Sequence, residues 1–122
     1  MSRCRSLENK KEIMKVSFDF DHSLTNPKYQ ELAKKFIALG AEVHITTSRK
    51  PNIVGEKHLY DNRQVFEIAQ QVGILAKNIT FTSYAEKYKF LKEFDLHFDD
   101  DEEEIAMINE HPCKCIGVLI QD

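Results

Sequence analysis

Little net charge and no long apolar run characterise this chain of 122 residues. The net charge of −3 argues against a protein that holds nucleic acid through broad neutralisation of phosphates. No apolar run approaches the ~18 residues that a membrane-spanning helix needs, so we expect no membrane partner. The basic N-terminal segment has no apolar stretch that would make it a secretory signal. By default, we expect a cytoplasmic protein.

Cysteine is scarce, with an odd count of three. Cys4 is remote from the other two, and a single residue separates Cys113 from Cys115. A C-x-C pair on a strand points to opposite faces of the sheet, and this spacing matches no common zinc site. We therefore expect ordinary thiols that bind no metal.

Apolar residues are present in the proportion of an ordinary soluble globular domain, at 42% of the chain beside 30% charged residues. A chain of 122 residues makes one domain with a real core and has no room for a second. The first strand pattern begins directly after Met14. We therefore expect a folded domain over residues 14–122 and an N-terminal extension over residues 1–13.

Short strand patterns alternate with helical apolar stripes along the domain. We expect strands around Val16–Phe20, Glu42–Thr47, Ile79–Phe81, Asp95–Phe98 and Ile116–Ile120. We expect helices from Pro27 to Gly40, from Asp61 to Gly73, from Ser83 to Phe94 and after Asp101. This alternation predicts an α/β fold with a parallel sheet and helices on both faces.

Local capping signals support the expected helix starts. Asn26 precedes a proline at the first helical position, and Gly40 and Gly73 follow helical stripes. Capping boxes are predicted for three further starts, in the pairs Asp61 and Gln64, Ser83 and Glu86, and Asp101 and Glu104. The apolar stripes of these helices are expected to face inward, at Val65, Phe66, Ala69 and Val72, at Tyr84, Tyr88, Leu91 and Phe94, and at Ile105 and Ile108.

Polar clusters follow the strands or open the helices of this pattern. They are Asp19 with Asp21, Thr47 with Ser48 and Arg49, Lys87, and Asp99 with Asp100. In an open parallel sheet, ligands bind at the carboxyl ends of the strands. Paired carboxylates at such a point can hold a hard cation and can do acid–base or nucleophilic work.

In these clusters the sequence resembles the haloacid dehalogenase-like (HAD) superfamily of phosphotransferases. The family's DxDx[TV] motif is matched by DFDHSLT, its strand ending in Thr or Ser by ITTSR, its lysine by Lys87 and its paired acids by LHFDDD. Ser23 stands where threonine is commoner, and His22 where glycine is frequent. The resemblance covers residues 14–120. It implies a three-layer Rossmann-like sheet of about five strands in the order 3-2-1-4-5. Many relatives carry a cap domain, but only Asn26 separates Thr25 from the first expected helix, so we expect no cap here.

The resemblance implies a Mg²⁺-dependent phosphomonoester hydrolase. Asp19 would be the nucleophile that forms an aspartyl-phosphate, and Asp21 would be the acid and base. Phosphate oxygens would be held by Thr47, Ser48, Arg49 and Lys87. The implied Mg²⁺ ligands are Asp19, the backbone carbonyl of Asp21, and Asp99 or Asp100, with the choice between the last two left open.

The lack of a cap implies an open site for a phosphorylated small molecule or a macromolecular phosphate ester. The site would suit a nucleotide, a nucleic-acid end or another large phosphorylated substrate, and the C-terminal part resembles the phosphatase half of bacteriophage polynucleotide kinase-phosphatases. The segment 50–60 is the one stretch long enough for a partial lid.

Two other readings remain. One is a binding module that keeps the HAD fold without catalysis. The other is a receiver-like phospho-acceptor domain, against which the order of the motifs argues, because Thr47 comes early and Lys87 precedes the paired acids.

Overall fold

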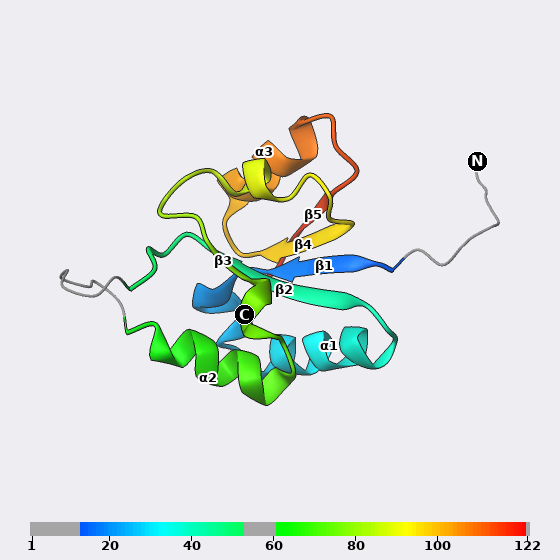
Figure 1. The fold of residues 1–122 in the computed structure, drawn as a ribbon. Helices are drawn as coiled ribbons and strands as arrows, with labels where there is room; N and C mark the ends of the chain where they lie inside the picture. Colours follow the sequence, from blue (N-terminus) through cyan, green and yellow to red (C-terminus); the bar gives the residue numbers. More distant parts are fainter. Residues whose placement is uncertain (1–12, 53–60, 122) are drawn as a thin grey trace.

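A computed structural model of the protein describes residues 13–52 and 61–121. Its centre is a sheet of five strands in the order β3-β2-β1-β4-β5, with every neighbouring pair parallel (Figure 1). The strands are β1 (Lys15–Phe18), β2 (Glu42–Thr47), β3 (Ile79–Phe81), β4 (Leu96–Asp99) and β5 (Ile116–Leu119). The predicted sheet and its strand order are confirmed.

Helices cover both faces of the sheet, as predicted. The helices α1 (Pro27–Ala38) and α2 (Arg63–Val72) lie together on one face, and α3 (Glu102–Glu110) lies on the other (Figure 1). The described residues form three layers and no second domain. No helix within residues 13–52 and 61–121 is both long and apolar enough to cross a bilayer. The predicted extension falls outside the described residues except for Ile13, as does most of the predicted lid.

The start of α1 and the end of α2 lie where the sequence predicts. The side chain of Asn26 accepts a hydrogen bond of 2.9 Å from the Lys28 amide, and Pro27 opens α1. Gly73 ends α2 with a φ of 105°, a left-handed conformation that glycine adopts without strain.

The main core lies between the sheet and the helices α1 and α2. Val16 and Phe18 alternate with polar residues along β1 and are fully buried there. The ring of Phe18 stacks on that of Phe98 with 4.8 Å between centroids, and Phe36 of α1 packs against both rings. A second cluster packs under α3 and consists of Leu91, Phe94, Ile105, Ile108 and Cys115. Cys113 and Cys115 are free thiols.

The prediction of a helix from Ser83 to Phe94 is wrong. Ser83 and Tyr84 have φ values of 54° and 69°, which a right-handed helix does not allow. Their amides instead donate hydrogen bonds to the carbonyls of Arg49 (3.2 Å) and Ser48 (2.8 Å) at the end of β2. Only a four-residue 3₁₀ turn, η3 (Lys87–Phe90), forms in this segment. Tyr84 is exposed and does not face the core.

The predicted start of α2 is also shifted. The helix begins at Arg63, after Asn62, and Asp61 Oδ1 accepts a hydrogen bond of 3.1 Å from the Arg63 amide. The predicted inward position Phe66 is 44% exposed, while Val65 is buried. The apolar stripe of α2 is therefore narrower than the sequence suggests.

Candidate metal and phosphate site

Strand register brings two of the predicted acids together. Phe18 of β1 pairs with Phe98 of β4, so that Asp19 and Asp99 follow as neighbours at the carboxyl ends of their strands. The Asp19 amide donates a hydrogen bond of 2.8 Å to the Phe98 carbonyl, which holds this register to the end of β1. Both carboxylates are buried.

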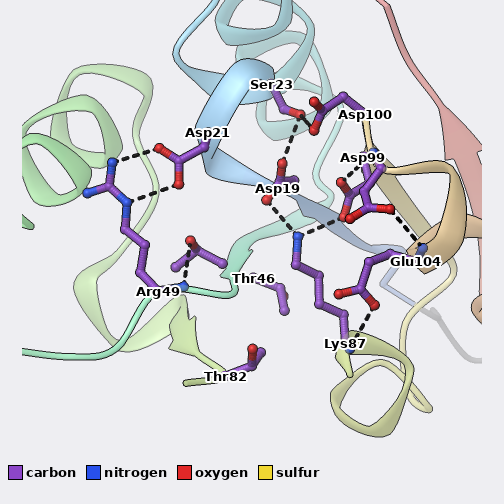
Figure 2. A network of polar contacts seen from close by, with 12 residues as sticks. Asp19, Asp21, Ser23, Thr46, Arg49, Thr82, Lys87, Asp99, Asp100 and Glu104 are labelled. Atoms are coloured by element: carbon purple, nitrogen blue, oxygen red, sulfur yellow. Dashed lines mark hydrogen bonds and ion pairs between the residues drawn. The ribbon is translucent and has the colours of Figure 1, made fainter. Parts of the chain in front are cut away.

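Lys87 joins these two acids (Figure 2). Its Nζ donates to Asp19 Oδ1 at 2.6 Å and to Asp99 Oδ2 at 2.7 Å, and the lysine is 3% exposed. The residue opens the η3 turn, and its amide donates a hydrogen bond of 3.1 Å to Glu104 Oε1 of α3. The lysine is thus held at both ends, through its backbone by α3 and through its ammonium by the sheet.

Three carboxylates are placed to hold a cation. Asp19, Asp99 and Asp100 each offer an oxygen, and these oxygens lie within 4.8 Å of one another. The Ser23 hydroxyl bridges two of them, at 3.1 Å from Asp19 Oδ2 and 3.4 Å from Asp100 Oδ1. Hard divalent cations such as Mg²⁺ take oxygen ligands of this kind. The group therefore fits a metal ion, and it includes both members of the acidic pair between which the sequence left a choice.

Charge is unbalanced in this group, because one lysine faces three acids. Burial raises the pKa of Asp19 to about 8, Lys87 opposes this rise, and the nearby Asp99 adds to it. Burial also acts to raise the pKa of Asp99, but hydrogen bonding to His97 and the charge of Lys87 lower that pKa to about 2. A bound cation would favour the charged form of Asp19.

Lys87 stays charged in this setting. Burial acts to lower the pKa of Lys87, but the charges of Asp19 and Asp99 outweigh it and raise the pKa above its usual value. The ammonium therefore offsets part of the negative charge that a phosphate would otherwise meet at this point.

His97 lies behind Asp99 and is fully buried. Its Nε2 is 2.8 Å from Asp99 Oδ2, and since an ionised carboxylate only accepts, Nε2 carries the hydrogen. Burial lowers the pKa of His97, which keeps the ring neutral. Its Nδ1 is buried with no hydrogen-bond partner in the described part of the chain. His97 therefore orients Asp99 from the core side, as its position two residues earlier on the same strand face allows.

Asp21 lies outside the group formed by Asp19, Asp99 and Asp100, and it pairs with Arg49. The guanidinium donates two parallel hydrogen bonds to the carboxylate, from Nη2 to Oδ1 at 2.7 Å and from Nε to Oδ2 at 3.0 Å (Figure 2). Arg49 also donates from Nη1 to Asn62 Oδ1 at 3.1 Å, and its guanidinium carbon lies 5.0 Å from the centroid of the Phe20 ring. The residue predicted to act as acid and base is therefore paired with an arginine that other contacts hold in place.

The hydroxyl residues at the end of β2 are buried or half-buried. Thr47 is fully buried, and its Oγ1 accepts a hydrogen bond of 3.3 Å from the Arg49 amide. Thr46, one residue earlier, is bonded to Ser17 of β1 through their hydroxyls at 2.7 Å. Ser48 is half-buried, and its carbonyl accepts the Tyr84 amide. These residues lie at the same edge of the sheet as the acids.

Two residues of the network were not singled out as site residues from the sequence. Glu104 is expected there only as part of a helix cap, yet its side chain holds the Lys87 amide, while Asp101 alone caps α3. Asn62 has no sequence signal that connects it with Arg49, thirteen residues earlier. Sequence spacing does not reveal such contacts, because they depend on the direction of side chains from separate elements.

A surface hollow adjoins the acids. It has a volume of about 420 Å³ and is lined by His22, Asp100, Ile120 and Gln121. His22 has a φ of 62°, at the kink of the short helical segment η1 (Phe20–Leu24) that carries Ser23. The group of three carboxylates is therefore reachable from solvent on the side of Asp100.

Comparison with known proteins adds no relative: no protein-family model matches the chain, and no curated protein shows significant similarity to it. The conclusions about the site therefore rest on its geometry. The chain is a small α/β domain with a parallel five-stranded sheet, and Asp19, Asp99 and Asp100 form a group at the strand ends that could hold a metal ion.

Proposed function

We propose that this protein is a Mg²⁺-dependent phosphomonoesterase of the HAD superfamily that acts through an aspartyl-phosphate on Asp19. The observation that carries the proposal is the meeting of Asp19, Lys87 and the pair Asp99–Asp100 at one edge of the sheet. A carboxylate nucleophile, a buried ammonium and a set of oxygen ligands are the groups that transfer of a phosphoryl group to a carboxylate needs.

The carboxylates of Asp19, Asp99 and Asp100 would hold the Mg²⁺, with the backbone carbonyl of Asp21 as a further ligand. When bound, the ion would neutralise charge on the carboxylates and on the phosphate oxygens. Lys87 also contributes to this neutralisation of charge, since its ammonium lies between Asp19 and Asp99. Thr47 and Ser48 would bind the remaining phosphoryl oxygens.

The reaction has two steps at Asp19. An oxygen of its carboxylate attacks the phosphorus, the ester P–O bond breaks, and Asp21 gives a proton to the leaving alcohol. Asp21 then takes a proton from a water molecule, whose oxygen attacks the phosphorus of the aspartyl-phosphate. This second step breaks the bond between the phosphorus and the Asp19 oxygen and releases inorganic phosphate. It returns Asp19 as a carboxylate and Asp21 as the protonated acid that the first step requires.

The substrate class that we favour is a large phosphate ester, such as a nucleotide or a nucleic-acid end. Two features support it: the described residues contain no second domain that would cover the site, and the hollow beside Asp100 is open to solvent. Sugar phosphates and phosphopeptides are the comparison classes in a screen of substrates.

The test is release of phosphate from p-nitrophenyl phosphate with Mg²⁺, before and after chelation. Asp19→Asn is expected to abolish turnover, because an amide is a poor nucleophile. Asp61→Asn is the matched control, since Asp61 is exposed and pairs with Arg63 at the surface. Activity that survives in Asp19→Asn would contradict the mechanism, and so would no turnover of aryl, nucleotide and 3′-phosphorylated oligonucleotide substrates.

A binding module without catalysis is the second candidate. The observation that favours it is the pair formed by Asp21 and Arg49, because both oxygens of the acid–base carboxylate are engaged there. Mg²⁺ binding by Asp19, Asp99 and Asp100 without turnover of any phosphate ester would support this candidate.

A further inference from the structure

Arg49 donates two parallel hydrogen bonds to Asp21, from Nε and Nη2, and the same pair of donors would fit two oxygens of a phosphate group. A guanidinium donates through a planar fork, and this geometry fits the paired oxygens of carboxylates and phosphates alike. In the protein without substrate, the fork is filled by the two oxygens of Asp21 at 2.7 and 3.0 Å. Asp21 therefore stands where an anion of the substrate could bind.

The arginine is anchored independently of Asp21. Its third nitrogen, Nη1, donates to Asn62, which is 1% exposed and itself donates from Nδ2 to the Lys50 carbonyl at 2.8 Å. Phe20 packs under the guanidinium, and the Arg49 amide bonds to Thr47. Removing Asp21 from the fork would leave these contacts in place.

Asn62 is used in an unusual way at this point. It stands at the N-cap position of α2, where an asparagine side chain ordinarily accepts a hydrogen bond from the first turn, but it makes no such bond. Both ends of its amide are directed to Arg49 and Lys50 instead. The Asp61 side chain instead accepts the amide of Arg63 at the start of α2, so the Asn62 amide group is available to hold the arginine.

Asp21 is the member of the pair that can move. Its side chain is 41% exposed, against 8% for that of Arg49, so it covers the fork from the solvent side. Asp21 also lies in the kinked segment η1, in which it and His22 have non-helical backbone angles. A turn of the Asp21 side chain toward Asp19 would open the fork to the substrate.

We propose that the Arg49 fork is a subsite for a second phosphate group of the substrate, next to the ester phosphate at Asp19, and that Asp21 fills it in the free protein. Binding of this second group displaces the Asp21 side chain toward the leaving oxygen. The subsite thus selects phosphomonoesters that carry a neighbouring phosphate. That phosphate is supplied either by a small bisphosphate or by the phosphodiester next to a nucleic-acid end. This inference rests on the proposed phosphatase function.

The experiment compares three substrates in the intact protein: a nucleoside 3′-monophosphate, the matching 3′,5′-bisphosphate and a 3′-phosphorylated oligonucleotide. Wild type is expected to favour at least one substrate with a second phosphate over the monophosphate by about ten- to a hundred-fold in kcat/KM. In Arg49→Gln this preference falls to near one. Arg63→Gln is the matched control, because Arg63 is exposed and pairs with Asp61 at the surface, and it keeps the preference.

Asn62→Ala separates the anchor from the charge. It is expected to reduce the preference less than Arg49→Gln does, since the guanidinium remains but is less well held. A wild-type preference within twofold of one for both larger substrates, or an unchanged preference in Arg49→Gln, overturns the proposal. A preference for the bisphosphate alone assigns the subsite to small molecules, and a preference for the oligonucleotide alone assigns it to nucleic-acid ends.

Binding distinguishes this inference from the phosphatase function itself. In Asp19→Asn, calorimetric titration with the bisphosphate and the monophosphate measures affinity without turnover. Tighter binding of the bisphosphate that is lost on adding Arg49→Gln supports the subsite even if wild type hydrolyses neither compound. Equal affinities for these two compounds, together with the same affinity for the 3′-phosphorylated oligonucleotide, overturn the subsite even if wild type hydrolyses all three.

Discussion

Lys87 Nζ lies 2.6 Å from Asp19 Oδ1, although 68 residues separate the two in the chain. Both side chains are almost excluded from solvent, and the same ammonium also reaches Asp99. A buried charge that loses its partner is strongly destabilising, because its own desolvation is no longer compensated. The pair therefore contributes to folding as well as to the proposed chemistry.

Lys87→Met tests both roles. We expect it to lower the free energy of unfolding of the metal-free protein by about 3–5 kcal/mol, since it leaves two buried carboxylates unpaired. Urea unfolding in the presence of a chelator measures this change. We also expect a loss of phosphate release with Mg²⁺, because a cation is removed from the developing phosphoryl charge.

Lys89→Met is the matched control for this variant. Lys89 lies two residues away and pairs with Glu86 at the surface, at 3.6 Å. An exposed pair of this kind contributes less than about 1 kcal/mol. Equal effects of the two substitutions on unfolding would contradict the role assigned to Lys87.

Metal binding is predicted to depend on Asp100. This carboxylate belongs to the group of three whose oxygens lie within 4.8 Å, and it lies on the solvent side of that group. Mg²⁺ is expected to raise the melting temperature of the wild type, because a ligand that binds only the folded state stabilises it. Asp100→Asn should weaken Mg²⁺ binding at least about tenfold, as measured by the Mg²⁺ dependence of melting.

Glu102→Gln is the control for Asp100→Asn. Glu102 is an exposed acid in the first turn of α3, outside the group of three carboxylates. The Glu102→Gln substitution removes the same charge two residues away, and it should leave the Mg²⁺ dependence of the melting temperature unchanged. A loss of Mg²⁺ binding in both variants would show that general negative charge, and not the carboxylate group, attracts the ion.

The architecture was predictable because its signals are local and repeated. Alternation along β1 and stripes along α1 each specify one element, and parallel connection of such elements leaves few topologies. The convergence of Asp19 with Asp99 and Asp100 was predictable for the same reason, since carboxyl ends of parallel strands share one edge of the sheet.

Contacts between segments that lie far apart in the sequence were not predictable, even where they override a local helix signal. The S-x-x-E signal at Ser83 favours a helix, but the amides of Ser83 and Tyr84 find acceptors at the end of β2. Those hydrogen bonds join segments more than thirty residues apart, and no short window of sequence contains both partners. The pairing of Asn62 with Arg49 is hidden for the same reason.

The pH dependence of stability should reveal the buried Asp19 carboxyl. Its pKa is raised from 3.8 to about 8 in the metal-free fold, so the folded state binds this proton more tightly than the unfolded state does. The stabilisation is fully present below about pH 3.8 and is lost as the pH rises through about 8. The pKa of Asp99 is lowered to about 2, so its contribution to stability depends on pH in the opposite direction. That contribution is lost only as the pH falls below 3.8 toward 2.

The measurement is the difference in melting temperature between wild type and Asp19→Asn, in a chelator, across this pH range. His97 has a lowered pKa and adds a slope of its own, which both proteins share and the difference removes. We expect the wild type to lose stability relative to Asp19→Asn as the pH rises. A difference that does not change between about pH 4 and pH 8 would show that Asp19 is ionised throughout.

Glu104 is predicted to act on the site through Lys87. Its Oε1 accepts the Lys87 amide at 3.1 Å, and burial raises the pKa of its half-buried carboxyl. Glu104→Ala removes the acceptor and should cost about 1 kcal/mol of unfolding free energy, together with a loss in kcat. Glu104→Gln keeps an oxygen acceptor and should restore most of the unfolding free energy and most of kcat, which a general charge effect would not.

Glu103→Ala, one residue earlier on the exposed side of α3, is the control and should change neither the unfolding free energy nor kcat. A fall in stability without any fall in kcat for Glu104→Ala would mean that the contact supports the fold alone and does not position the lysine.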